Sequence, residues 1–412
     1  SISACIMTLS VAFAALLCIG PSIGVSQPLG DNSGSHHWAV LIAGSKGYDN
    51  YGHQADICHA YQILKRRGIP EEHIITFSYN DVVNDPKNPY PGNLFNEPTD
   101  TDPGVDVYEG CKLDYSHDEV TVKNVEGVLT GDTSLATGRV LKSTKDDYVF
   151  INYVNHGGPG LLGLVDKPIS KKQVRSWLEA METKKMYKQL VFYVEACESG
   201  SMFDGLPTIP NQYYVTAANE SEVSFATYCT PNDVVGNVSL GTCLGDHFSV
   251  NWMEDEETRD PRNNNETLQH QYDMVRKETD DSHVMQYGDT SFTQEPTEYF
   301  MGNRRAAKLK FLSNHGPGSE AIARGVLQSF FGSRRESNST WEEETLARKA
   351  RLRDIKKASS IPSPMVPIHL RYSKLREEER KPSNREGQLQ AAEELLMAVQ
   401  GRVKQLRERL GK

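Results

Sequence analysis

Two stretches, LVFYVEACESGS at residues 190–201 and YVFINYVNHGGPG at residues 148–160, decide the fold. Each begins as an apolar run rich in β-branched and aromatic residues, which is typical of a buried strand. Each then reaches a reactive side chain followed by small residues, Cys197 in the first and His156 in the second. Roughly 40 residues separate the two side chains, enough for a helical crossover between parallel strands. A thiol and an imidazole are therefore expected together at the carboxyl edge of a sheet, where open α/β folds bind ligands.

The flanking segments favour the same α/β class. An apolar run at residues 36–44 predicts a strand, residues 53–67 carry apolar side chains at helical spacing, and residues 74–79 predict a second strand. This β-loop-α-β order is typical of the start of a parallel sheet. Further helices are expected at 120–129, 138–141, 171–186, 244–254 and 267–278, and a further strand at 212–218. The proline-rich segment 80–118 is too long for a simple connection and is expected to carry function or cover a site.

Composition and charge exclude several classes of protein. The chain has 412 residues and a formal net charge of −10, which argues against nucleic-acid binding. No long apolar stretch follows the first residues, so a multi-span membrane protein is excluded. Residues 5–19, CIMTLSVAFAALLCI, predict a secretory signal peptide over residues 1–26, with a membrane anchor as the alternative.

The cysteines agree with a secretory route. Cys229 and Cys243 flank a segment rich in Pro, Asn and Gly, and we expect them to form a disulfide in an oxidising compartment. No Cys or His spacing indicates zinc, so neither a metal nor a cofactor is expected. Four Asn-x-Ser/Thr acceptors predict a glycoprotein, at Asn219, Asn237, Asn265 and Asn338.

The residues at the two strand ends suit nucleophilic catalysis. Cys197 is the candidate nucleophile and His156 its base, because a neighbouring imidazole activates a thiol. The backbone N–H groups of Gly157 and Cys197 are candidates for an oxyanion hole. Glu195 lies two residues before Cys197 and faces the same side of the strand. The alternatives are an inert core cysteine and a simple His-Gly-Gly turn, which lacks the ending of a phosphate-binding loop.

At this point the sequence resembles a known family, the legumains or asparaginyl endopeptidases, which are caspase-like cysteine peptidases. The resemblance runs from His37 to about Gly302. The matching stretches are WAVLIAGS, HQADICHAYQIL, FYVEACESGSMF, YVTAANESE, LGDHFSVNWMED and SHVMQYGD.

This resemblance implies a caspase-like fold with a mainly parallel six-stranded sheet flanked by helices, within residues 36–302. It also implies cleavage of peptide bonds after Asn, and less readily after Asp, through a thioester on Cys197. Asn50 would orient His156. The expected pocket for the Asn side chain consists of His53, Glu195, Asp246, Ser224 and Phe225.

Two positions depart from the family pattern. Gly52 stands where the family usually has Arg, in NYGHQAD, and offers no side-chain donor to the substrate amide. Asn155 stands where the family usually has Asp before the histidine. A carboxylate beside an imidazole favours the charged ring, so an amide there is expected to alter the pH profile. We therefore expect weakened or altered specificity, and we keep a peptide-binding protein of weak activity and a peptide ligase as alternatives.

The tail resembles the activation segment, at 303–367, and part of the helical pro-domain, at 368–412, of an inactive precursor. Asn303, Asn314 and Asn338 are expected self-cleavage positions. The expected partners are peptide or protein substrates and the chain's own pro-region, with no nucleic acid and no membrane after removal of the leader. The chain is expected in the secretory pathway, the lysosome or vacuole, or outside the cell, as a monomer or a precursor dimer.

Overall fold

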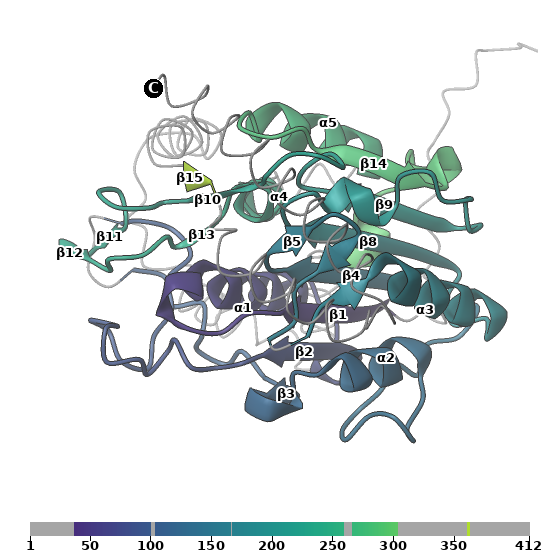
Figure 1. Cartoon of the computed structure of the whole chain (residues 1–412), viewed down its shortest axis with the longest axis horizontal. Helices are drawn as coiled ribbons and strands as arrows, with labels where there is room; N and C mark the ends of the chain where they lie inside the picture. Colours follow the sequence, from purple (N-terminus) through teal and green to yellow (C-terminus); the bar gives the residue numbers. More distant parts are fainter. Residues whose placement is uncertain (1–36, 100–103, 166, 259–265, 304–360, 363–412) are drawn as a thin grey trace, which may run out of the picture. The chain divides into compact units, whose positions relative to one another are not determined.

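A seven-stranded sheet forms the centre of the computed structural model, which describes residues 37–99, 104–165, 167–258, 266–303 and 361–362. The strand order is β14-β9-β8-β4-β1-β2-β3 (Figure 1). Six strands run parallel and β14 is antiparallel to β9. The strands are β1 (His37–Ala43), β2 (Ile74–Ser78), β3 (Tyr115–Ser116), β4 (Tyr148–Val154), β8 (Gln189–Glu195), β9 (Gln212–Thr216) and β14 (Met285–Gly288).

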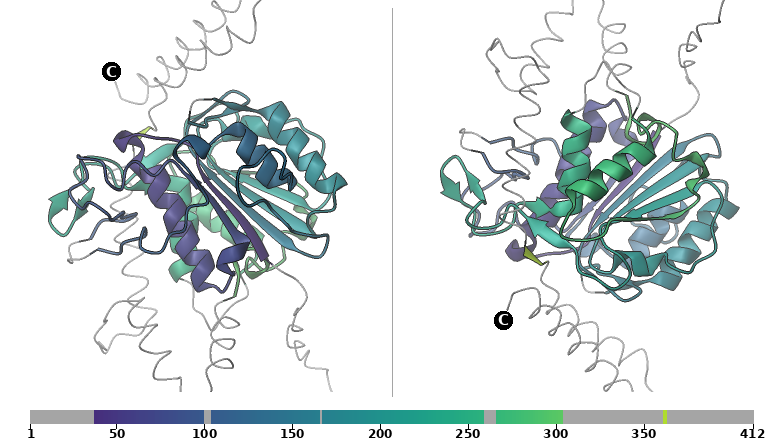
Figure 2. Two further views of the ribbon diagram at one scale, coloured as in Figure 1. Left: turned by 90° about the horizontal axis from the view of Figure 1, so that it is seen from below. Right: turned by 90° about the horizontal axis from the view of Figure 1, so that it is seen from above.

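Helices cover both faces of this sheet. Helices α2 and α3 lie on one face, and α1, α4 and α5 lie on the other (Figure 2). The alternation along β1 explains the arrangement, because Val40 and Ile42 join one core while Ala39 and Leu41 join the other. A strand buried on both faces is apolar throughout, which is why the runs at β4 and β8 were recognisable in the sequence. The helices are α1 (Tyr51–Arg66), α2 (Val122–Thr130), α3 (Lys171–Thr183), α4 (His247–Thr258), α5 (Leu268–Glu278) and α6 (Glu298–Met301).

The predicted mainly parallel α/β sheet is confirmed, with an antiparallel edge strand β14 beyond the six parallel strands. The predicted helical piece at 138–141 is wrong. The chain is irregular there because the N–H of Gly138 donates to the Tyr115 hydroxyl at 3.1 Å and Leu141 inserts into the core. The predicted leader, and all of the predicted tail except Asn303 and β15 (Ile361–Pro362), lie outside the described residues.

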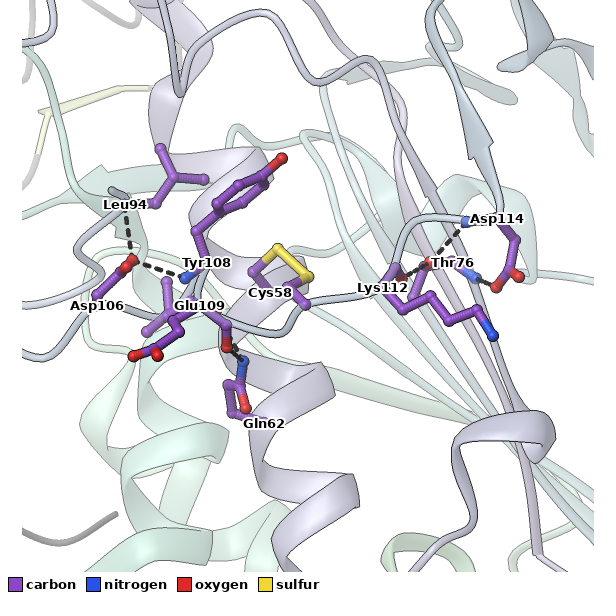
Figure 3. Close-up of a disulfide and its surroundings, with 11 residues drawn as sticks. Cys58, Gln62, Thr76, Leu94, Asp106, Tyr108, Glu109, Lys112 and Asp114 are labelled. Atoms are coloured by element: carbon purple, nitrogen blue, oxygen red, sulfur yellow. Dashed lines mark hydrogen bonds between the residues drawn. A yellow bond between two sulfur atoms is a disulfide. The ribbon is translucent and has the colours of Figure 1, made fainter. Parts of the chain in front are cut away.

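Two disulfides occur among the described residues. Cys229–Cys243 is the predicted one, and its Cα atoms lie 3.9 Å apart. Cys58–Cys111 was not predicted, and it ties helix α1 to the long loop that precedes β3 (Figure 3). Beside it, Gln62 on α1 donates to the carbonyl of Glu109 at 2.8 Å. The loop is thus fixed against α1, the helix that also carries site residues.

Short elements complete the sheet edge where the site lies. They include the 3-10 helices η1 (Tyr48–Asn50) and η4 (Ser199–Met202). Two short strands, β10 (Phe225–Thr227) and β13 (Gly245–Asp246), pair antiparallel beside α4. No helix among the described residues has both the length and the apolar character needed to cross a membrane.

The packing of α4 against the sheet gives a stability prediction. The Trp252 side chain is fully buried, and its ring lies 5.7 Å from that of Phe150 and 5.9 Å from that of Tyr193. Truncation leaves a cavity, so Trp252→Ala is expected to lower the free energy of unfolding by about 3–5 kcal/mol. Urea denaturation measures this. Val105→Ala, at a side chain that is 59% exposed, serves as the control and is expected to change it by less than about 0.5 kcal/mol. A loss below about 1 kcal/mol for Trp252→Ala would contradict the packing.

Candidate active site

The site is built where β4 and β8 end together. The two strands pair in parallel up to Val154 and Glu195, and the N–H of Asn155 then donates to the Glu195 carbonyl at 3.0 Å. His156 and Cys197 each follow two residues after that last register pair. The pairing of the strands therefore carries both residues to the same edge of the sheet.

The two turns pack against each other at their backbones. A Cβ atom at Gly157 would lie 2.0 Å from the Cys197 carbonyl oxygen and 3.0 Å from the Ala196 methyl group. No side chain fits in that space, so glycine is required for the histidine turn to approach the cysteine turn. Glu198 adopts a left-handed conformation, with φ 53°, and so turns the chain directly after Cys197.

Asn50 fixes the orientation of His156. The Asn50 amide nitrogen donates to the Lys46 carbonyl at 2.8 Å, so its oxygen faces the His156 Nε2 atom at 2.7 Å. An amide oxygen can only accept, so Nε2 carries the proton. The tautomer selected by this bond has its lone pair on Nδ1, which is the form that can take a proton from a thiol.

Burial sets the charge of the imidazole. Removal of the ring from water lowers the pKa of His156 from 6.5 to about 4, because the charged form is poorly solvated there. The neighbouring His53 ring lies 4.9 Å away in an edge-on arrangement. Burial also lowers the pKa of His53 well below its usual range, and His156 adds to that effect. Both rings are neutral at mildly acidic pH, so His156 can act as a base there.

The thiol of Cys197 lies among polar atoms. The side chain is fully buried, and Sγ lies 3.9 Å from the Ser224 carbonyl oxygen and 3.8 Å from the Ser224 hydroxyl. This environment differs from the hydrocarbon packing of an inert core cysteine. In the part of the chain that the structure describes, Cys197 is the one cysteine outside a disulfide.

The predicted pocket residues come together beside the thiol. The His53 Nε2 atom lies 3.5 Å from Asp246 Oδ2, and Glu195 accepts hydrogen bonds from the Ser249 N–H at 2.9 Å and hydroxyl at 3.2 Å. Ala226 pairs with Asp246, and the two buried residues before Ala226 are Phe225 and Ser224, of which Ser224 contacts the thiol. The pocket therefore draws on α1, β8, β10 and β13.

A buried carboxyl that the sequence did not single out completes this cluster. Asp56 accepts from the Asn96 amide at 2.7 Å and from the Asp246 N–H at 3.2 Å. Burial raises the pKa values of Asp56, Glu195 and Asp246 well above their usual range, and charge repulsion from one neighbouring carboxyl raises each of them further. Asp56 follows His53 by three residues on α1, a spacing that places both on one helix face and could have revealed it.

The two departures from the family pattern occupy tightly packed positions. A Cβ atom at Gly52 would lie 2.9 Å from the Gly245 Cα atom and 3.0 Å from its nitrogen. A side chain at residue 52 would thus require the β13 backbone to move. The Asn155 side chain is buried. It packs against Gly44, where an added Cβ atom would lie only 2.7 Å from the Asn155 amide nitrogen.

Comparison with known proteins identifies the family of the chain. The model of the Peptidase C13 family matches residues 37–303. The chain belongs to the Peptidase C13 family. The resemblance inferred from the sequence motifs is therefore confirmed.

Curated relatives of this Peptidase C13 chain include legumain from Mus musculus, 42% identical over 308 residues, which are 73% of this chain and 67% of that protein. Legumain from Canavalia ensiformis is 43% identical over 67% of this chain and 59% of that protein. Vacuolar-processing enzyme beta-isozyme 1 from Oryza sativa subsp. japonica is 43% identical over 65% of this chain and 55% of that protein. The chain thus spans about three fifths of the length of these relatives. A crystal structure of caspase-1 from Spodoptera frugiperda aligns with TM-score 0.34 and 10% identity over 59% of this chain and 78% of that chain.

The close contact of the two turns gives a prediction with a matched control. Gly157→Ala places a methyl group against the Cys197 carbonyl, so the turns must separate, and we expect Cys197 to lose at least about 100-fold in alkylation rate by a peptide electrophile. At the neighbouring Gly158, a Cβ atom meets nothing within 4 Å, so Gly158→Ala is expected to react as the unmodified chain does. Equal rates for the two variants would contradict the packing.

Proposed function

We propose that the chain is a cysteine endopeptidase that cleaves after Asn, and less readily after Asp, through a thioester on Cys197. One observation carries the proposal. An imidazole held as the Nε2–H tautomer by Asn50 ends its strand beside the strand that ends in Cys197, next to a buried polar pocket. Membership of a peptidase family and the names of the curated relatives support it.

In the proposed reaction, His156 takes the proton of Cys197 and the sulfur attacks the carbonyl carbon of the scissile bond. The N–H groups of Gly157 and Cys197 would stabilise the oxyanion. His156 then protonates the leaving amine, and water hydrolyses the thioester in a second attack. Asn50 acts as a positioning residue because it holds the ring and its tautomer.

The pocket suits an amide side chain. A primary amide offers both a donor and an acceptor, and His53, Glu195 and Asp246 present both kinds of partner within a buried space. Buried polar groups reject side chains that cannot pair with them. Ser224 and Phe225 would form the adjoining wall at the start of β10. No side-chain donor stands at residue 52 to hold the amide oxygen, so the proposed selectivity for Asn is reduced.

We further propose that the chain is a precursor in the secretory pathway, delivered to a lysosome or vacuole or secreted. The two disulfides support an oxidising compartment. Residues 303–367 would be the activation segment and residues 368–412 part of a pro-domain that covers the site, in a monomer or a precursor dimer. Of the three proposed self-cleavage positions, Asn303 lies within the described residues. Its amide nitrogen donates to the Glu298 carboxyl at 2.6 Å, and this contact must break before Asn303 can be cleaved.

A peptide-binding protein of weak activity is the second candidate. The observation that favours it is the packing of Gly52 against Gly245, which leaves no room for the missing donor without a backbone shift.

Kinetic comparison on Asn, Asp and Ala peptides separates the two candidates. After acid treatment, we expect turnover of the Asn peptide with a kcat/KM about 10–100-fold below that of mouse legumain assayed alongside, because one hydrogen bond to the amide is lost. Cys197→Ala is the control without a nucleophile. Equal efficiency to mouse legumain would contradict the role of Gly52, and no turnover above the Cys197→Ala background would support the binding protein. Joined products with an added peptide amine would indicate ligation.

The pKa of His156 predicts the acid limit of activity. Because burial lowers that pKa to about 4, the ring stays neutral down to about pH 4 and gains a proton below it. A protonated ring cannot accept the thiol proton, so kcat/KM for the Asn peptide is expected to fall with an apparent pKa near 4. An acid limb near pH 6.5, the value of an exposed histidine, would contradict the burial of this ring. The profile is measured on matured protein, so that activation does not limit the rate.

A further inference from the structure

A second cluster of metal-ligating side chains lies outside the catalytic residues. His247 is the first residue of α4 and follows the pocket residue Asp246 directly. Asp280 and Asp281 lie in the connection between α5 and β14. One nitrogen or oxygen atom from each of these three side chains lies within 4.8 Å of the others. The sequence could not indicate this cluster, because the histidine and the two aspartates are far apart along the chain.

The histidine in this cluster has an unsatisfied nitrogen. The His247 side chain is 2% exposed, and its Nδ1 atom is buried without a hydrogen-bond partner among the described residues. That atom faces the cluster, 3.5 Å from Asp281 Oδ2, at a geometry that does not make a hydrogen bond. A buried ring nitrogen without a partner is costly, and a metal ion would satisfy it.

We propose that His247, Asp280 and Asp281 form a binding site for a divalent transition-metal ion of the zinc class. One imidazole nitrogen with two carboxylate oxygens is a donor set that suits Zn²⁺. Ca²⁺ and Mg²⁺ prefer oxygen donors alone, so the imidazole disfavours them. This site goes beyond the proposed peptidase reaction, which needs no metal, and it revises the expectation from the sequence that no metal binds.

The spacing of the donors fits the ion. Bonds of about 2.0–2.2 Å in a tetrahedral site place neighbouring donor atoms about 3.3–3.6 Å apart. The His247 Nδ1 to Asp281 Oδ2 distance of 3.5 Å already has this length. The Asp280 side chain is exposed, and its oxygen lies within 4.8 Å of the other two donor atoms. A water molecule would be the fourth ligand.

The position of the site gives the ion a structural consequence. It would link the start of α4 to the connection between α5 and β14, two segments that are remote in sequence. Because Asp246 is bonded to His247, the same link would hold the pocket strand β13 in place. A bound ion is therefore expected to raise the thermal midpoint of unfolding by a few degrees.

Zinc titration of the full chain carrying Cys197→Ala tests the proposal, because that background removes the catalytic thiol as a competing ligand. Isothermal calorimetry with zinc chloride at neutral pH is expected to show one ion bound. Adding His247→Gln or Asp281→Asn is expected to weaken binding at least tenfold. Asp273→Asn is the matched control, because Asp273 is an exposed aspartate on α5 outside the cluster. This variant is expected to bind zinc as the Cys197→Ala background does.

Two further measurements decide the assignment. X-ray absorption of the zinc-loaded protein is expected to show an imidazole among nitrogen and oxygen ligands, and the imidazole signal should vanish with His247→Gln. Asp281 is partly exposed, so Asp281→Asn is expected to keep the fold and tests the site even if His247→Gln unfolds. The proposal would be overturned if the Asp281→Asn variant bound zinc as tightly as the background. It would also be overturned if His53→Gln, rather than the substitutions in the cluster, abolished zinc binding. Because every arm measures binding in an inactive variant, failure of the peptidase proposal would not affect the result.

Discussion

The parallel pairing of β4 with β8 is the constraint on which the site depends. These are the central strands of the sheet, buried on both faces, so their register is strongly determined. The register continues through the Asn155 to Glu195 hydrogen bond into the two turns. There Gly157 lets the turns meet without a side chain between them. Two reactive groups remote in sequence are thereby held by the core of the protein rather than by a mobile loop.

The pocket beside these turns concentrates polar groups in a buried space. Two of the three carboxyls there accept hydrogen bonds, Glu195 from Ser249 and Asp56 from Asn96 and the Asp246 N–H, which offset part of the cost of burying them. Under the proposed function, such a pocket would be preorganised for a polar side chain of a substrate. Gly52, which packs closely against β13, offers no side-chain donor to the pocket. In the proposed reaction, nucleophilic chemistry and selectivity would therefore rest on separate parts of the site.

The features that the sequence predicts are those whose evidence lies within one short segment. Burial on both faces makes β4 and β8 continuous apolar runs, and α1 carries apolar side chains at helical spacing although almost all of its residues are buried. Contacts between distant segments leave no such pattern. The Cys58–Cys111 disulfide and the approach of Asn96 to Asp56 depend on the course of the long loop. Strand β14 pairs with β9, and its sequence, MQYG, is too short to predict a strand by itself. The Cys197 turn was predicted because a reactive residue ends a strand, whereas the His247 cluster required the fold.

The reactivity of Cys197 tests the central claim most directly. A peptide ending in Asn and carrying a thiol-reactive electrophile is incubated with matured protein, and the modified residue and its rate are determined by mass spectrometry. The account predicts a single adduct, on Cys197. The His156→Ala variant is expected to form this adduct at least about 100-fold more slowly than the unsubstituted protein, because the base is lost. Modification at other residues, or an unchanged rate without the imidazole, would show that the strand ends do not form a catalytic pair.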